Sequence, residues 1–286
     1  MRVGAIDLGT NTTRLLVADV VDGRVDELHR ESRITRLGEG VDARRRLLPL
    51  PVARVRNVLT DYHRTLESLG AERTLAVATS AVRDAENGEA FLGEVEWSYG
   101  FATRLVSGDE EAQLTRRGVA PAADTLVLDI GGGSTELILG DFHVSLPMGS
   151  VRFTERYGDD VARIEEEAHG QLPDVSPRNA TGVAGTVVQL AELAQTQRLT
   201  RAHAREQLEQ LAGMSVAERR SLPRMEPERA PVIVAGAAIL VAVLDAYELE
   251  EIDVSRLDLL DGIALAAAEL PEPAEGDAPP GAYTCC

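Results

Sequence analysis

Two similar stretches set the fold of this sequence: DLGTNTTRLLVAD at residues 7–19 and DIGGGSTELILGD at residues 129–141. They align without gaps, and the identical pairs are Asp7 with Asp129, Gly9 with Gly131, Thr13 with Thr135, Leu15 with Leu137, and Asp19 with Asp141. In each stretch an apolar run ends in aspartate, a loop of small and polar residues follows, and a second apolar run begins. An internal repeat of this kind predicts a duplicated domain.

The patterns around the first repeat predict a mixture of strands and helices. Apolar runs separated by turn residues over the first 32 positions indicate three antiparallel strands. Between Pro51 and Leu69 the apolar spacing becomes that of a helix, which ends at Gly70. Shorter strand and helix patterns then alternate as far as a helix that begins near Ser107.

The second repeat opens the same order of elements again. Helical patterns at 201–211 and 230–249 interrupt that order before a last strand and helix at 252–270. We therefore expect two α/β domains, residues 1–122 and 123–270, followed by a flexible tail at 271–286.

The charge of the chain limits its partners. A formal net charge of -18 argues against a nucleic-acid partner, since such binding depends on surplus cations. All 29 basic residues are arginine, so a polyanion would have to be bound by local arginine clusters. Arg36, Arg44, Arg45 and Arg46 could guide an anionic chain, or could simply belong to a solvated loop.

Several features predict a cytoplasmic protein without a membrane partner. The only cysteines, Cys285 and Cys286, are adjacent and cannot build a disulfide framework. The N-terminus enters a strand pattern directly and shows no secretory leader. The apolar run 231–244 is shorter than the roughly 20 residues that a membrane helix needs. This run is explained by a buried core helix, or alternatively by a homodimer interface.

The repeated loops are suited to phosphate. A turn rich in Gly, Ser and Thr between two strands can direct several N–H and hydroxyl groups at one point. A plain hairpin would explain Gly131, Gly132 and Gly133 alone, but it would not require an aspartate before the loop in both copies. Near the loops, Asp7, Asp129 and Glu136 offer the hard oxygen ligands that Mg²⁺ prefers, although Glu136 could also be an ordinary strand residue.

A helix start supplies a candidate general base. Ser107 and Glu110 have the spacing of a capping box, which explains Glu110. Glu111 has no such explanation, and it could either take a proton from an attacking water or merely interact favourably with the helix dipole. Arg83 could bind phosphate, or could pair with Asp84 or Glu86.

Taken together, these motifs resemble the exopolyphosphatase and guanosine pentaphosphate phosphatase family of the actin, sugar kinase and heat-shock chaperone ATPase superfamily. The resemblance runs over nearly all of residues 1–270 and is carried by AIDLGTNTTRLLVADV, RLGEGVD, ATSAVRDAEN, SGDEEAQL, LVLDIGGGSTELILG, LPMGSVRFTERY, GVAGTV and VSRLDLLDGIAL. It implies two ribonuclease-H-like (actin-like ATPase) domains with an interdomain cleft, dependence on Mg²⁺ or Mn²⁺, and release of orthophosphate from the ends of polyphosphate.

The resemblance also assigns roles by position. It implies that Glu111 is the general base and that Asp129 and Glu136 hold the metal, with Asp7 in addition. It places nucleotide contacts of the wider superfamily at Gly185 and Thr186. The phosphate contacts that it implies are Gly9, Thr10, Asn11, Thr12, Arg83, Gly131, Gly132, Gly133, Ser134 and Thr135.

We therefore expect a hydrolase, with exopolyphosphatase as the leading hypothesis and inorganic polyphosphate as the substrate. The alternative is a guanosine pentaphosphate 5'-phosphohydrolase, because both substrates offer the same reacting end. An ATP-binding protein of the actin or sugar kinase type shares the fold, and a non-catalytic sensor of phosphorylated alarmones would share the loops.

Overall fold

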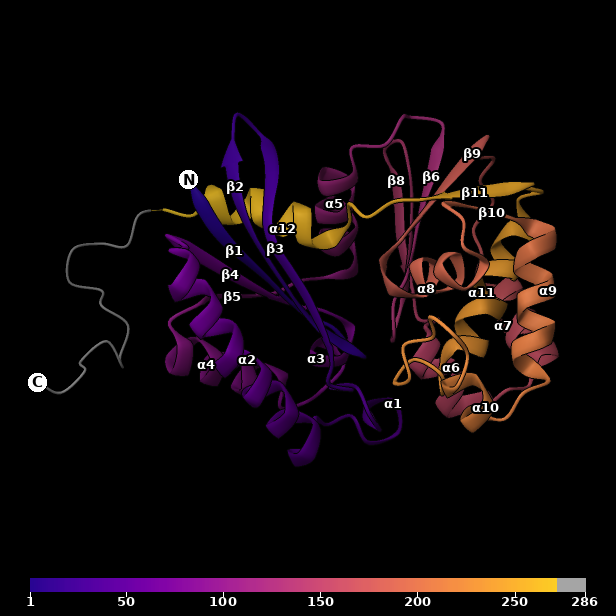
Figure 1. Ribbon diagram of the computed structural model, residues 1–286, viewed down its shortest axis with the longest axis horizontal. Coiled ribbons are helices and arrows are strands. Elements are labelled where there is room, and N and C mark those ends of the chain that lie inside the picture. Colours follow the sequence, from indigo (N-terminus) through magenta and orange to yellow (C-terminus); the bar gives the residue numbers. More distant parts are fainter. Residues whose placement is uncertain (272–286) are drawn as a thin grey trace, which may run out of the picture. The chain divides into compact units, whose positions relative to one another are not determined.

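The computed structural model describes residues 1–271, which form two compact units (Figure 1). Unit 1 contains residues 1–118 and the described residues from Leu259 onward, and unit 2 contains residues 119–258. The expected second domain, 123–270, differs from unit 2 at its end, because the last helix packs its apolar side chains on the sheet of unit 1. Apart from Pro271, the expected tail at 271–286 lies outside the described residues.

The sheet of unit 1 contains the three antiparallel strands that the first repeat predicts. Its order is β3-β2-β1-β4-β5, in which β4 and β5 add in parallel beside β1. The strands are β1 (Arg2–Leu8), β2 (Thr12–Val21), β3 (Arg24–Ile34), β4 (Arg73–Ala78) and β5 (Ala102–Leu105).

Helices cover both faces of this sheet (Figure 1). Because side chains alternate along β1, Ile6 and Leu8 pack with α2 and α4, whereas Val3 and Ala5 pack with α5 and α12. The helix that begins with prolines and ends at Gly70 is α2, and Gly70 closes it in a left-handed conformation with φ 71°. The helices are α1 (Val41–Arg44), α2 (Pro49–Leu69), α3 (Ser80–Arg83), α4 (Gly88–Tyr99), α5 (Gly108–Val119) and α12 (Leu259–Ala268).

The sheet of unit 2 repeats that of unit 1 with one additional strand. Its order is β10-β11-β9-β6-β7-β8, so β6, β7, β8, β9 and β11 correspond to β1, β2, β3, β4 and β5. The edge strand β10 has no counterpart in unit 1, and the sequence patterns did not predict it. The strands are β6 (Thr125–Ile130), β7 (Thr135–Leu139), β8 (Phe142–Leu146), β9 (Asn179–Val183), β10 (Arg198–Thr200) and β11 (Glu251–Val254).

The core of unit 2 surrounds one apolar helix, α11 (Ile233–Ala246). All its residues from Ile233 to Leu244 are buried, so the segment 231–244 is explained by the core of this unit. No helix within residues 1–271 has both the length and the apolar character required to cross a membrane. The other helices are α6 (Ser150–Tyr157), α7 (Val161–Gln171), α8 (Ala184–Ala194), α9 (Arg201–Ala212) and α10 (Val216–Arg220).

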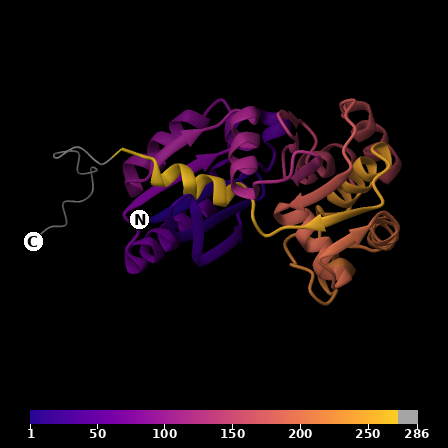
Figure 2. The same cartoon turned by 90° about the horizontal axis from the view of Figure 1, so that it is seen from above.

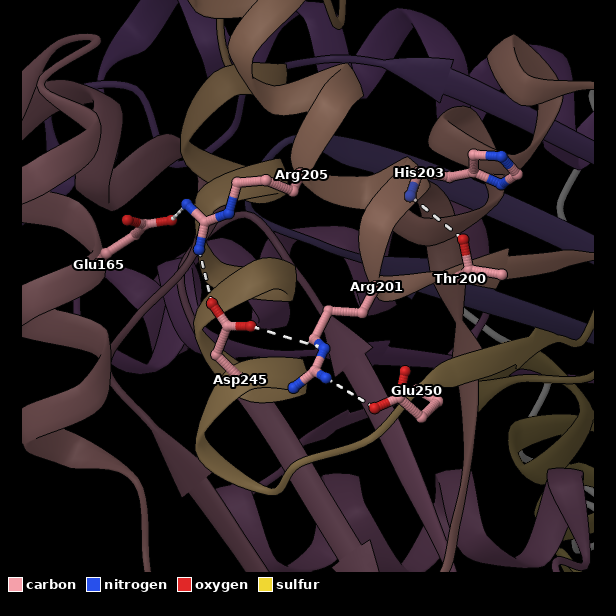
Figure 3. A network of polar contacts seen from close by, with 7 residues as sticks. All are labelled: Glu165, Thr200, Arg201, His203, Arg205, Asp245 and Glu250. Carbon is pink, nitrogen blue, oxygen red and sulfur yellow. Dashed lines mark hydrogen bonds and ion pairs between the residues drawn. The ribbon is translucent and has the colours of Figure 1, made fainter.

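Ion pairs of an arginine on α9 link this helix to both α7 and α11 (Figure 3). Arg205 of α9 lies 2.5 Å from Glu165 of α7 and 2.6 Å from Asp245 of α11. Arg201 lies one helical turn before Arg205 on α9. It donates a hydrogen bond to Glu250 at 2.7 Å. This network links α7, α9 and α11, whose apolar residues pack in the same core.

In contrast to these partly exposed arginines, an arginine of α10 is fully buried. The side chain of Arg219 in α10 is only 1% exposed. Its Nε donates to the Leu211 carbonyl oxygen at 2.7 Å, and its guanidinium pairs with Asp159 at 2.6 Å. Removing it would leave the Leu211 carbonyl oxygen, in a buried residue, without this donor, which is costly.

We predict that Arg219→Met lowers the free energy of unfolding of the protein by about 2–4 kcal/mol. The neighbouring Arg220 is exposed, so Arg220→Met is the matched control and should change stability by less than about 0.5 kcal/mol. Urea denaturation followed by circular dichroism measures both values. Equal effects of the two substitutions would contradict this account of Arg219.

Candidate functional site

The first loop, residues 9–12, joins β1 to β2 and is closed by a backbone hydrogen bond. The Gly9 N–H donates to the Thr12 carbonyl oxygen at 3.1 Å. A Cβ at Gly9 would lie 2.8 Å from that oxygen, so only glycine fits without a shift. The segment after β3 holds the loop from outside, since the Gly38 N–H donates to Thr10 O at 2.8 Å and the Arg36 N–H to Asn11 O at 2.9 Å.

The second loop, residues 131–134, has the same construction in unit 2. Its Gly131 N–H donates to Ser134 O at 3.0 Å, which is the equivalent bond in the repeat. The first turn of α6 then binds the loop carbonyls, with the Val151 and Arg152 N–H groups at 2.8 and 3.0 Å from Gly132 O. Within residues 1–271, the N–H groups of Gly132 and Gly133 have no hydrogen-bond partner, so they remain available to an anion.

The support of the second loop includes residues that the sequence analysis did not select. A Cβ at Gly149 would lie 2.5 Å from Gly132 O, so α6 can approach the loop only because position 149 is glycine. The Arg152 Nε donates to Gly133 O at 2.7 Å, and the Thr135 hydroxyl donates to Met148 O at 2.6 Å. Gly149 and Arg152 lie in the motif LPMGSVRFTERY, which the resemblance used without giving it a role. Thr135 was expected to contact phosphate instead.

Two carboxylates of unit 2 lie side by side. Asp129 on β6 and Glu136 on β7 are directly opposed in the antiparallel register, so their side chains share one face of the sheet. Both residues are buried, with 6% and 1% exposure. On the next strand, the hydroxyl of Ser145 donates to Glu136 Oε1 at 2.7 Å. Sequence analysis missed Ser145, because its partner is defined only by the strand register.

These two carboxylates fit a divalent cation. Like charges at directly opposed positions repel one another, and a bound cation removes that repulsion. Mg²⁺ in particular is commonly bound by one or two carboxylates together with water and substrate oxygens. Within the described residues, no group of three or more His, Cys, Asp or Glu side chains is arranged to hold a metal.

Asp7 has a different neighbour. Its cross-strand partner is Arg14, whose Nε lies 2.8 Å from Asp7 Oδ2. Arg14 occupies the position that Glu136 occupies in the second repeat. The first copy therefore has a cation where the second copy has another carboxylate.

Glu111 lies in the first turn of α5 and is 7% exposed. The expected capping box is present: the Ser107 N–H donates to Glu110 at 2.8 Å, and the Glu110 N–H donates to the Ser107 hydroxyl at 3.2 Å. The backbone hydrogen bond from Ser107 lowers the pKa of Glu110. Glu110 is therefore explained by capping, while the Glu111 carboxylate takes no part in the capping box.

Arg83 pairs with Glu111 and not with Asp84 or Glu86, the ion pairs that the sequence offered as an alternative to phosphate binding. Its Nη1 lies 3.3 Å from Glu111 Oε2 and donates to the Val106 carbonyl oxygen at 2.8 Å. The pair forms because Arg83 ends α3, which follows β4, and Glu111 begins α5, which follows the neighbouring parallel strand β5. Asp7 lies on the same face of this sheet as α5, because side chains alternate along β1.

The remaining candidates have other neighbours. The hydroxyl of Thr186 donates to Ile130 O at 2.9 Å, and a Cβ at Gly185 would lie 2.5 Å from the guanidinium carbon of Arg229. The arginines at positions 44–46 are exposed, and Arg45 lies 3.9 Å from Asp84.

A model of the Ppx/GppA phosphatase family matches residues 16–269. A protein named Exopolyphosphatase 2, from Mycobacterium tuberculosis, is 39% identical to the chain, with 93% of this chain and 98% of that protein covered. The crystal structure of an exopolyphosphatase from Cytophaga hutchinsonii is 25% identical and covers 92% of this chain and 96% of its own, with a TM-score of 0.83. The Aquifex aeolicus Ppx/GppA family member is 28% identical over 94% of this chain and 97% of its own, with a TM-score of 0.76.

These likenesses confirm the predicted fold class, which is α/β with two sheets. They also confirm the resemblance on which the expected enzyme class rested. Because the family model covers most of the sequence, including the second loop, Asp129, Glu136 and Glu111, the chain belongs to the Ppx/GppA phosphatase family.

Proposed function

We propose that this protein hydrolyses the terminal phosphoanhydride bond of inorganic polyphosphate and releases orthophosphate. The observation that carries this proposal is the buried Glu111 carboxylate, which lies in the first turn of α5 and is fixed by Arg83 at 3.3 Å. A relative named Exopolyphosphatase 2, at 39% identity, supports the same activity. Preference for polyphosphate over guanosine pentaphosphate is part of this proposal.

Glu111 acts in this proposal as the general base. A water oxygen attacks the terminal phosphorus, and Glu111 accepts one of the water's protons as the new phosphorus–oxygen bond forms. The bond to the bridging oxygen breaks, and that oxygen leaves as the new end of a polyphosphate chain one unit shorter. The orthophosphate then leaves, and Glu111 returns its proton to solvent.

The phosphate contacts are assigned to the two loops and to Arg83. Backbone N–H groups in a glycine-rich loop can bind phosphate oxygens and stabilise the charge that develops during transfer. The free N–H groups of Gly132 and Gly133 support this role within the described residues. The other assigned residues are Gly9, Thr10, Asn11, Thr12, Gly131, Ser134 and Thr135.

Asp129 and Glu136 are assigned as the residues that hold Mg²⁺ or Mn²⁺. The family is generally dependent on a divalent metal, and the opposed pair of carboxylates fits such an ion. When bound, the ion would neutralise phosphate charge. Asp7 is the weaker candidate ligand, because the guanidinium of Arg14 already neutralises it at 2.8 Å.

We predict that Glu111→Gln lowers kcat by about a hundredfold or more with little change in KM, because a general base acts only in the chemical step. Glu110→Gln is the matched control, since the neighbouring Glu110 caps the helix and should be dispensable for turnover. Orthophosphate release under saturating and limiting substrate gives both constants. Full activity of Glu111→Gln would remove Glu111 from the mechanism.

The substrate preference is tested by measuring orthophosphate release from long polyphosphate, short polyphosphate and guanosine pentaphosphate in parallel. We expect the highest kcat/KM on polyphosphate, and we expect EDTA to abolish release until Mg²⁺ is restored. Faster turnover of guanosine pentaphosphate would make the protein a guanosine pentaphosphate phosphohydrolase. Binding of all three substrates without turnover would contradict an enzymatic role.

We predict that Glu136→Gln raises the Mg²⁺ concentration for half-maximal activity by about tenfold to a hundredfold, the usual cost of disturbing a metal site. Asp141→Asn is the control, because Asp141 is an exposed carboxylate just beyond the end of the same strand. Magnesium titrations of the activity measure the shift. If both variants required the same Mg²⁺ concentration as the unaltered protein, Glu136 would not be a ligand.

A further inference from the structure

The helix α12 contains most of the motif VSRLDLLDGIAL, to which the proposed function gives no role. Figure 2 shows this helix in yellow, lying against the rest of unit 1. Leu259, Leu260 and Ile263 of α12 pack in one apolar cluster with Val3 of β1 and Leu114 of α5. Residues at the two ends of the sequence thus share one core with the helix that begins near Glu111.

The backbones of α12 and α5 touch at one point. A Cβ at Gly262 would overlap the carbonyl oxygen of Leu114 and lie 2.5 Å from its carbonyl carbon. Because these are backbone atoms of a helix, a side-chain rotation cannot relieve the overlap, and the helices would have to move apart. Glycine at position 262 therefore sets the distance between α12 and α5.

Further contacts fix α12 on either side of this point. Asp261 is 3% exposed and pairs with Arg30 of β3 at 3.0 Å, which fixes the rotation of the helix. Beyond the end of α12, Glu269 pairs with Arg117, in the last turn of α5. As a result, α12 is a fixed support for α5.

Glu111 is one helical turn from the point of contact. Leu114 follows Glu111 by three residues, so a displacement of α5 at Leu114 also displaces the Glu111 backbone. The carboxylate must at the same time reach Arg83, which is anchored on the Val106 carbonyl oxygen at 2.8 Å. Two contacts thus determine the position of Glu111: the ion pair with Arg83, and the packing of α5 against α12.

We propose that Gly262 is a positioning residue for Glu111: the close approach of α12 to α5 holds the carboxylate where it can accept the proton of the attacking water. This inference rests on the proposed function, in which Glu111 is the general base. The C-terminal motif then contributes to catalysis by packing against α5, without contacting the substrate.

The test is Gly262→Ala. We expect kcat to fall about tenfold to a hundredfold while KM changes less than about threefold, because a displacement of about 1 Å at a catalytic group has effects of this size. Gly93→Ala is the matched control, since Gly93 also lies within a helix of unit 1 and its added Cβ would meet nothing within 4 Å. That control should keep the kcat of the unaltered protein.

A double-mutant cycle separates positioning from general destabilisation. If Gly262 acts through Glu111, adding Gly262→Ala to Glu111→Gln should lower kcat no further, because the base is already absent. A loss equal to that in the unaltered protein would overturn the inference. Full activity of Glu111→Gln alone would instead refute the proposed function, and the two failures are thereby distinguishable.

Leu114→Ala keeps the inference testable if Gly262→Ala does not fold. This substitution removes the Leu114 side chain from the cluster shared by α5 and α12 and leaves Glu111 itself intact. We expect a lowered kcat that again disappears in the Glu111→Gln background. An unchanged kcat in folded Leu114→Ala would overturn the inference.

Discussion

The closure of two short loops is the constraint from which the candidate phosphate contacts follow. In both units, a glycine N–H binds the carbonyl oxygen three residues later, at 3.1 Å in the first loop and 3.0 Å in the second. The segment after the third strand then binds other loop carbonyls. These bonds use the carbonyl oxygens of the loops. Within the described structure, the N–H groups of Gly132 and Gly133 have no partner and can therefore bind an anion.

The two copies differ in charge at one pair of equivalent positions. Arg14 neutralises Asp7 in unit 1, whereas Glu136 adds a second negative charge beside Asp129 in unit 2. Opposed like charges destabilise a sheet, and the hydroxyl of Ser145 donates a hydrogen bond to Glu136. Asp7 is thus paired with a cation on the adjacent strand, whereas two carboxylates face each other in unit 2. In the proposed function, the duplicated scaffold therefore holds one metal ion, at unit 2.

The sequence predicted the features that depend on local chemistry. The repeat predicted both strand–loop–strand units, and the spacing of Ser107 and Glu110 predicted the cap of α5. Other features depend on packing between distant segments. The edge strand β10 is only three residues long and shows no strand pattern, and the apolar residues of α12 indicate burial without indicating which core buries them. The pairing of Arg83 with Glu111 required knowledge that β4 and β5 are neighbours.

The candidate phosphate contacts and the proposed general base depend on different ranges of the sequence. The loops are formed by contiguous residues, so a segment such as residues 125–152 contains both the second loop and its support on α6. The proposed base depends instead on β4 and β5, and on α12, which follows β5 by more than a hundred residues along the chain. In the proposed function, each phosphate-binding loop therefore depends mainly on its own repeat, whereas the position of Glu111 depends on distant segments of unit 1. At Gly262, α12 contacts the backbone of α5, the helix that carries the proposed base.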